Sequence, residues 1–188
     1  EAQILSTLPF DNNTKWPDAA RLPKGFDPVR LLEDGRNPGL GVRSLHARGI
    51  DGRGVGAAIV DQPLLLTHEE YADRLTRYTP LEVEGISPQM HGAPVASILV
   101  GKTCGVAPGA SLYYYAEPSW KWPDCKYFCN VIEMILETNK TLPETERIRV
   151  VSISTGMFPG WPNYDNWKKT VDKAAQSGVL VITCEQSW

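Results

Sequence analysis

Short apolar runs alternate with segments of helical periodicity from about residue 41 to the end of the chain. The run at residues 55–60 is apolar throughout, which is typical of a strand buried on both faces of a parallel sheet. Further strands are predicted at 110–116, 148–154 and 178–184, and helices at 91–100, 124–139 and 164–177. Strands separated by helices indicate βαβ crossovers. We therefore predict an α/β fold built on a parallel sheet, with a variable loop at 61–90.

The first 40 residues have a different character. They contain scattered polar residues and five prolines, Pro9, Pro17, Pro23, Pro28 and Pro38. Proline removes a backbone donor and interrupts helices and central strands. We predict that residues 1–40 form an extended proline-rich arm that wraps the domain, and that residues 41–188 form the α/β body.

Charge and hydropathy narrow the classes of function. The formal net charge is −3 with no basic stripe, which argues against a nucleic-acid-binding protein. No apolar run approaches the ~20 residues that a membrane-spanning helix needs. The first residue is Glu1, which begins neither a signal peptide nor a translated chain. We expect the 188 residues to be part of a longer protein.

Two polar residues stand at the borders of predicted elements. Asp61 ends the apolar run 55–60, and His91 comes directly before the helix at 91–100. Functional groups of parallel sheets gather where the strands end, and a carboxylate there can orient an imidazole. Gly92 allows a close backbone approach beside the ring. Taken singly, Asp61 could be a turn residue and His91 a packed or surface residue.

Four cysteines leave the redox state open. Cys104, Cys125, Cys129 and Cys184 permit two disulfides in three pairings. Cys125 and Cys129 lie one helical turn apart, a spacing suited to metal ligation or to packing. The chain has only three histidines, none of them nearby in sequence, so packing is favoured and we expect no metal and no cofactor. The cellular compartment stays open, with secretion favoured over the cytoplasm.

Several ordered segments resemble those of the subtilisin-like serine proteases, the subtilases. They are the helix and glycine-rich turn at 41–54, the strand ending in Asp61, the helix beginning at His91, the turn and strand at 104–112, the strand at 150–156 and the strand at 178–183. The resemblance implies a subtilisin-like parallel sheet with helices on both faces. It also implies that the chain ends before the segment that carries the nucleophilic serine.

The resemblance assigns roles to particular residues. It implies peptide-bond hydrolysis by a catalytic triad of Asp61, His91 and a serine outside this chain. Ser154, Thr155 and Gly156 correspond to the substrate-binding strand, whose partner is a peptide or protein substrate. Gln186 and Ser187 stand where the oxyanion-hole donors are expected. No nucleic acid, membrane or cofactor is implied.

Departures from the family pattern keep other functions open. Gln62-Pro63 follows Asp61 and Ala93-Pro94 follows His91-Gly92, where the family usually has other residues. The main alternative is a catalytically inactive subtilase fold, a pseudoprotease that serves as a peptide-binding or regulatory module. A weaker alternative pairs His91 with Cys184 as a thiol nucleophile, although a cysteine in a buried strand is usually inert. We expect the 188-residue chain alone to be inactive and to self-associate through an exposed sheet edge.

Overall fold

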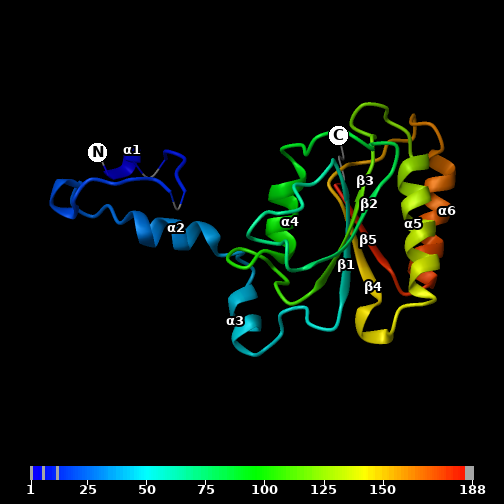
Figure 1. The fold of residues 1–188 in the computed structure, drawn as a ribbon, viewed down its shortest axis with the longest axis horizontal. Coiled ribbons are helices and arrows are strands. Elements are labelled where there is room, and N and C mark those ends of the chain that lie inside the picture. Colours follow the sequence, from blue (N-terminus) through cyan, green and yellow to red (C-terminus); the bar gives the residue numbers. More distant parts are fainter. Residues whose placement is uncertain (1, 6, 12, 185–188) are drawn as a thin grey trace.

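Five parallel strands form one sheet in the computed structural model, which describes residues 2–5, 7–11 and 13–184 (Figure 1). The strand order is β2-β3-β1-β4-β5, and all four pairings are parallel. Consecutive parallel strands require crossovers, and the helices supply three of them. The strands are β1 (Gly56–Asp61), β2 (Leu75–Pro80), β3 (Ser111–Ala116), β4 (Ile148–Ile153) and β5 (Leu180–Thr183).

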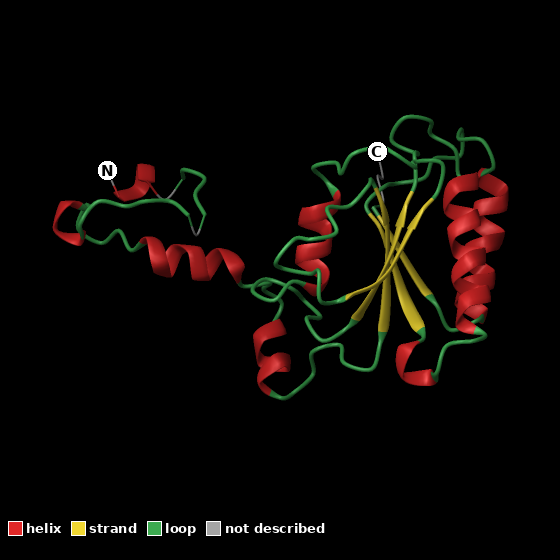
Figure 2. Ribbon diagram, in the orientation of Figure 1, coloured by secondary structure: helices red, strands yellow, loops and turns green. Residues whose placement is uncertain are grey.

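Helices cover both faces of the sheet (Figure 2). Helix α4 (Gly92–Val100) packs on one face, and α5 (Lys126–Asn139) and α6 (Tyr164–Gln176) pack side by side on the other. Each face has its own apolar core, one centred on α4 and the other on α5 and α6. The predicted α/β class and the parallel sheet are confirmed, and so are the helices predicted at 91–100, 124–139 and 164–177.

Strand β1 occupies the centre of the sheet. All six of its residues are buried, and it lies between β3 and β4. Alternate side chains of a strand point to opposite faces, so Ala58 and Val60 join the core under α5 while Ala57 and Ile59 join the core under α4. Burial on both faces explains the unbroken apolar run in the sequence, and it brings Asp61 to the carboxyl edge of the sheet.

Strand β2 was predicted as part of a variable loop, and this prediction was wrong. Residues Leu75–Pro80 pair with β3 at the edge of the sheet, with only intermediate burial and two exposed positions. Edge strands tolerate charged residues and proline on their open side, here Arg77 and Pro80. The apolar signal of such a strand is weak, because one side of it faces solvent.

The N-terminal arm is partly helical, where a wholly extended segment was predicted. It contains α1 (Ala2–Leu5), a 3-10 helix at Ala19–Arg21 and α2 (Pro28–Arg36). Helix α2 begins because the Asp27 carboxylate accepts the backbone N–H groups of Val29 and Arg30, and Pro28 stands in the first turn, where its missing N–H costs nothing. Pro28 therefore starts a helix instead of preventing one.

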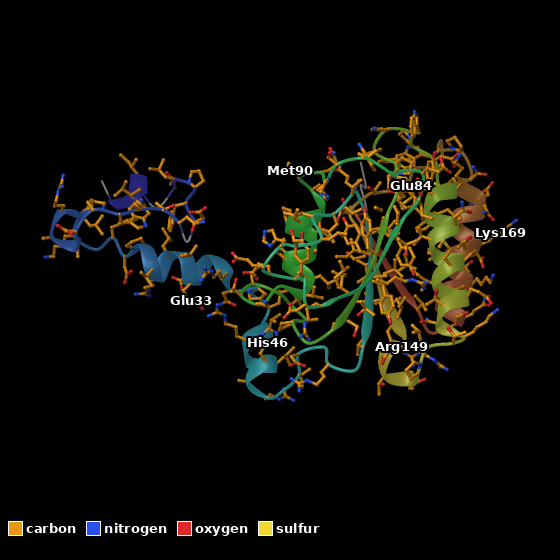
Figure 3. All side chains as sticks on the ribbon, in the orientation of Figure 1. Glu33, His46, Glu84, Met90, Arg149 and Lys169 are labelled. Atoms are coloured by element: carbon orange, nitrogen blue, oxygen red, sulfur yellow. The ribbon has the colours of Figure 1, made fainter. Side chains whose placement is uncertain are left out.

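The arm stands beside the body and does not wrap it (Figure 1). It is joined to α3 (Val42–Ala47) through three consecutive residues with left-handed backbone, Gly39, Leu40 and Gly41, whose φ angles are 72°, 51° and 75°. An ion pair between Glu33 of α2 and Arg43 of α3 spans this joint, and Figure 3 labels Glu33 next to it. None of the helices in the described part of the chain is long and apolar enough to cross a membrane.

Candidate active site

Asp61 presents a buried carboxylate at the carboxyl end of the central strand. The residue is 8% exposed, and its Oδ1 accepts the backbone N–H of Gln62 at 2.7 Å. This bond fixes the orientation of the carboxylate, because the donor belongs to the backbone that leaves the strand. The apolar residues that bury β1 therefore also hold Asp61 in place.

His91 lies at the N-cap of α4, directly across from Asp61. Its Nδ1 is 2.9 Å from both Oδ1 and Oδ2 of Asp61, and its side chain remains 45% exposed. An ionised carboxylate can only accept hydrogen bonds, so the contact favours the proton on Nδ1 and leaves the Nε2 lone pair free. The predicted contact between Asp61 and His91 is confirmed.

A cavity of about 150 Å³ opens beside this pair. Three neighbouring strands and one helix line it at the carboxyl edge of the sheet, the edge where ligands bind in open parallel sheets. The lining residues come from the ends of β1, β3 and β4 and from the start of α4: Val60, Asp61, Gln62, Glu117, Ser119, Trp120, Ser154, Thr155 and His91. Strands that are distant in sequence thus assemble one pocket.

Two of the other predicted site residues line this cavity. Ser154 and Thr155 line it, and Gly156 follows them directly in the chain. Gln186 and Ser187, the predicted oxyanion donors, lie outside the described residues. Cys184 is exposed and follows the end of β5, so the expectation of a buried strand cysteine was wrong.

Glu117 is a residue of the cavity that the sequence interpretation missed. It is 2% exposed, and its carboxylate accepts both the backbone N–H and the hydroxyl of Ser119 at 2.6 Å. Burial raises the pKa of Glu117 to about 7, with a further contribution from the negative charge of Asp61, while the Ser119 bonds oppose the shift. A glutamate directly after the apolar residues of β3 was the available signal, because strand ends gather functional groups.

All four cysteines are free thiols, and Cys125 and Cys129, at the start of α5, are buried in the core that this helix covers. Burial raises the pKa of Cys125 to about 11, so the free thiol is protonated near neutral pH. Across residues 2–5, 7–11 and 13–184, no group of three histidine, cysteine or acidic side chains is placed to hold a metal ion.

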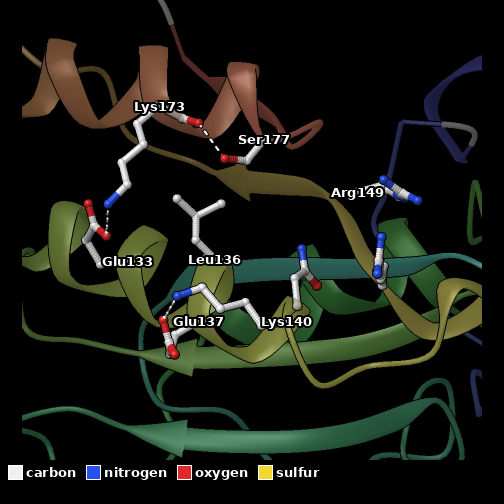
Figure 4. A pocket seen from close by; sticks show the side chains of 9 residues that line it. Glu133, Leu136, Glu137, Lys140, Arg149, Lys173 and Ser177 are labelled. Carbon is white, nitrogen blue, oxygen red and sulfur yellow. Dashed lines mark hydrogen bonds and ion pairs between the residues drawn. The ribbon is translucent and has the colours of Figure 1, made fainter.

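A second cavity, of about 320 Å³, lies at the opposite end of the sheet (Figure 4). It lies between α5, α6 and the start of β4, where Figure 3 labels Arg149 far from Met90, the neighbour of His91. Its lysines are already paired, Lys173 with Glu133 and Lys140 with Glu137, each at 2.5 Å. Because these exposed charges are paired with one another, the cavity is a charged hollow on the surface. It lies far from the Asp61–His91 pair.

Similar solved structures are proteases that share the fold. The chain superposes on the prenylagaramide maturation protease PagA with a TM-score of 0.59 and 21% identity, over 77% of this chain and 50% of that one. It superposes on the nisin leader peptidase NisP from Lactococcus lactis with a TM-score of 0.58 and 15% identity, over 80% of this chain and 48% of that one. The chain therefore spans about half the length of these structures.

Sequence comparison gives the family. The chain is 36% identical over 85 residues to the subtilisin-like protease PopC of Myxococcus xanthus (strain DK1622), a match that covers 39% of this chain and 18% of PopC. The model of the subtilase family, Peptidase_S8, matches residues 52–185, which include β1 with Asp61 and α4 with His91. The chain belongs to the subtilase family.

Proposed function

We propose that this chain is part of a serine endopeptidase in which Asp61 and His91 act with a serine supplied by another part of the protein. The observation that supports this most directly is the 2.9 Å contact between His91 Nδ1 and the buried Asp61 carboxylate. A subtilase uses such an Asp–His pair to activate a serine hydroxyl as the nucleophile. The contact is made by residues brought together from two separate elements at the edge where such chemistry takes place.

The two residues would divide the work of proton transfer. With Nδ1 held by Asp61, His91 Nε2 takes the proton from the serine hydroxyl as the hydroxyl attacks the scissile carbonyl, and later returns it to the leaving amine. Asp61 keeps the ring oriented and stabilises the imidazolium that forms. Because Asp61 is buried, its charge acts on the ring with little screening by water.

Ser154 and Thr155 are proposed to bind the substrate backbone. They follow the end of β4 and line the cavity that also contains His91. An extended peptide can pair with such a segment as an added strand, which gives main-chain hydrogen bonds and leaves specificity to side-chain pockets. The scissile bond would then lie over the Asp61–His91 pair.

The test is His91-dependent labelling of the full-length protein. A fluorophosphonate probe should modify one serine, and His91→Ala should lower both labelling and peptide hydrolysis by at least about 10³-fold. His46→Ala is the matched control, because His46 does not line the cavity and its Nε2 bonds the Val106 carbonyl instead. Equal activity in wild type and His91→Ala would reject the proposal.

The alternative is a pseudoprotease that retains the peptide site without the chemistry. Gln62-Pro63 and Ala93-Pro94, beside the two proposed catalytic residues, motivate it. A full-length protein that binds peptides and shows neither probe labelling nor His91-dependent turnover would decide for this alternative. Residues 1–188 alone should be inactive in either case, since we place the nucleophile outside them.

A further inference from the structure

The hydroxyl of Tyr114 lies where the segments carrying Asp61 and His91 meet. It donates a hydrogen bond of 2.6 Å to the carbonyl of Gln62, the residue directly after Asp61. It also lies beneath Gly92, the residue directly after His91, where an added Cβ would come within 2.3 Å of the Tyr114 oxygen. One side-chain atom thus touches the backbone next to both members of the pair.

Tyr114 is itself held rigidly. It is fully buried in the middle of β3, in register with Ile59 of β1. Its ring stacks against Tyr78 of β2, with centroids 5.9 Å apart and planes 25° from parallel. A side chain confined on both sides by sheet neighbours keeps one rotamer, so its hydroxyl is a fixed point at the carboxyl edge.

Gly92 is required here for space and not for an unusual backbone angle. Its φ is not in the left-handed region, yet an added Cβ would meet the Tyr114 hydroxyl and, at 3.1 Å, the Gln62 carbonyl. The start of α4 can therefore approach β3 only because position 92 has no side chain. The hydroxyl of Tyr114 fills the space that the glycine leaves, and so sets how closely His91 approaches the end of β1.

We propose that Tyr114 is a positioning residue that holds the Asp61 carboxylate and the His91 ring at hydrogen-bonding distance. This role in catalysis rests on the proposed protease function, whereas the effect on the geometry of the pair does not. Without the hydroxyl, the Gln62 carbonyl loses its donor and the turn after Asp61 is free to shift away from His91. Tyr114 acts through backbone and touches neither substrate nor nucleophile.

The hydroxyl stays a donor across the working pH range. Burial raises the pKa of Tyr114, and the charges of Asp61 and Glu117 together with the neighbouring Tyr78 and Tyr71 raise it further. The acidic groups that share the cavity with His91 are Asp61 and Glu117. The contact to Gln62 therefore persists while other groups of the site change their charge.

The first test compares Tyr114→Phe with Tyr71→Phe in full-length protein labelled with ¹⁵N-histidine. Tyr71 is a matched control: it is also fully buried, and its hydroxyl donates to the carbonyl of Leu65 at 2.9 Å, in the loop that follows Asp61. The shifts of the ring nitrogens report the share of the Nδ1–H tautomer, and His91→Gln assigns the His91 signals. Tyr114→Phe should lower the ratio of Nδ1–H to Nε2–H tautomer at His91 about fivefold, the effect of about one hydrogen bond.

His46 and His68 provide internal references, since neither contacts Tyr114 in the described structure. Their signals should not move in Tyr114→Phe, and Tyr71→Phe should leave His91 unchanged. A Tyr114→Phe protein whose His91 tautomer ratio equals that of Tyr71→Phe would overturn the proposal.

A second variant tests the same contact from the other side and does not alter β3. Gly92→Ala forces the Tyr114 hydroxyl away from its place and should also lower the Nδ1–H share of His91. Gly35→Ala in α2 is its control, because an added Cβ there meets nothing within 4 Å. If Tyr114→Phe does not fold, an unchanged His91 signal in Gly92→Ala rejects the proposal and a changed one supports it.

An activity measurement separates this inference from the proposed function. If the protein is a protease, Tyr114→Phe should lower kcat about fivefold or more and leave KM nearly unchanged, because substrate contacts are not altered. A wild type without turnover would reject the proposed function alone, since the tautomer ratio is still measurable in that protein.

Discussion

A buried carboxyl group beside the Asp61–His91 pair should make the stability of the protein depend on pH. Glu117 is 2% exposed, and its pKa is raised to about 7 from 4.5 because burial disfavours the ionised form. The folded state then binds more protons than the unfolded state between these two values. The contribution of Glu117 to stability is complete below about pH 4.5 and is lost as the pH rises through about 7.

Glu117→Gln should remove this part of the pH dependence. Between pH 4.5 and pH 8 the wild type should lose about 3 kcal/mol of unfolding free energy more than the variant does, since one pKa unit corresponds to about 1.4 kcal/mol. Urea unfolding at several pH values measures the difference. The exposed Glu69→Gln is the control and should follow the wild type. Parallel pH curves for wild type and Glu117→Gln would show that Glu117 is not a perturbed group.

The sequence was informative about the residues that end elements and uninformative about those that become important through packing. Asp61 and His91 could be found because each stands at the border of an apolar segment. Tyr114 could not, since it is one of three consecutive tyrosines and only the register with β1 and the approach of Gly92 distinguish it. Glu117 is an intermediate case. The sequence shows that it follows a strand, but its burial beside Asp61 depends on the fold.

At the scale of elements, the start of β1 depends on a glycine that allows close contact with the segment leading into β4. A Cβ at Gly56 would lie 2.6 Å from the carbonyl oxygen of Glu146 and 2.9 Å from that of Arg147. The Gly56 N–H also donates to the Arg147 carbonyl at 2.9 Å. Both obstacles are backbone atoms, so a side chain could be accommodated only if the strands moved apart.

Gly56→Ala should therefore destabilise the sheet by about 1–3 kcal/mol, the usual cost of overpacking a well-packed region. Gly160→Ala is the control, because an added Cβ at this loop position meets nothing within 4 Å and its φ is not left-handed. Denaturant unfolding measures both variants. Equal midpoints would mean that the two strands separate at little cost.

Central and peripheral elements differed in how well the sequence predicted them. The strands β1 and β3 were predictable because burial on both faces demands nearly continuous apolar residues. Strand β4 includes Arg149 and Ser152 and is only partly buried, but four of its six residues are Ile or Val, which are common in strands. Strand β2 was not predictable, since an edge position accepts polar residues, and α2 was hidden by the proline that begins it. Helix capping and edge pairing depend on one or two contacts, which leave a weaker trace in the sequence than a core does.

At the scale of the whole molecule, the sheet formed by the described residues ends in an open edge at β5. Among the strands that the structure describes, β5 pairs only with β4, so one row of its backbone donors and acceptors is unpaired. On β5 the side chains of Leu180 and Ile182 are 59% and 50% exposed, whereas Val181 between them packs against the core under α5 and α6. An open edge with adjacent apolar side chains is a surface that pairs readily with another strand.

We therefore expect a preparation of residues 1–188 to self-associate through two copies of β5, as the sequence analysis anticipated. Ile182→Lys should weaken the association at least about tenfold, because each copy loses an apolar side chain from the interface and gains a charge there. Val29→Lys is the control, since Val29 of α2 is 77% exposed on the arm, away from β5. Sedimentation equilibrium at several concentrations gives the dissociation constant of each variant. If Ile182→Lys associates as strongly as the wild type while Val29→Lys is weakened, the arm and not the sheet edge is the contact surface.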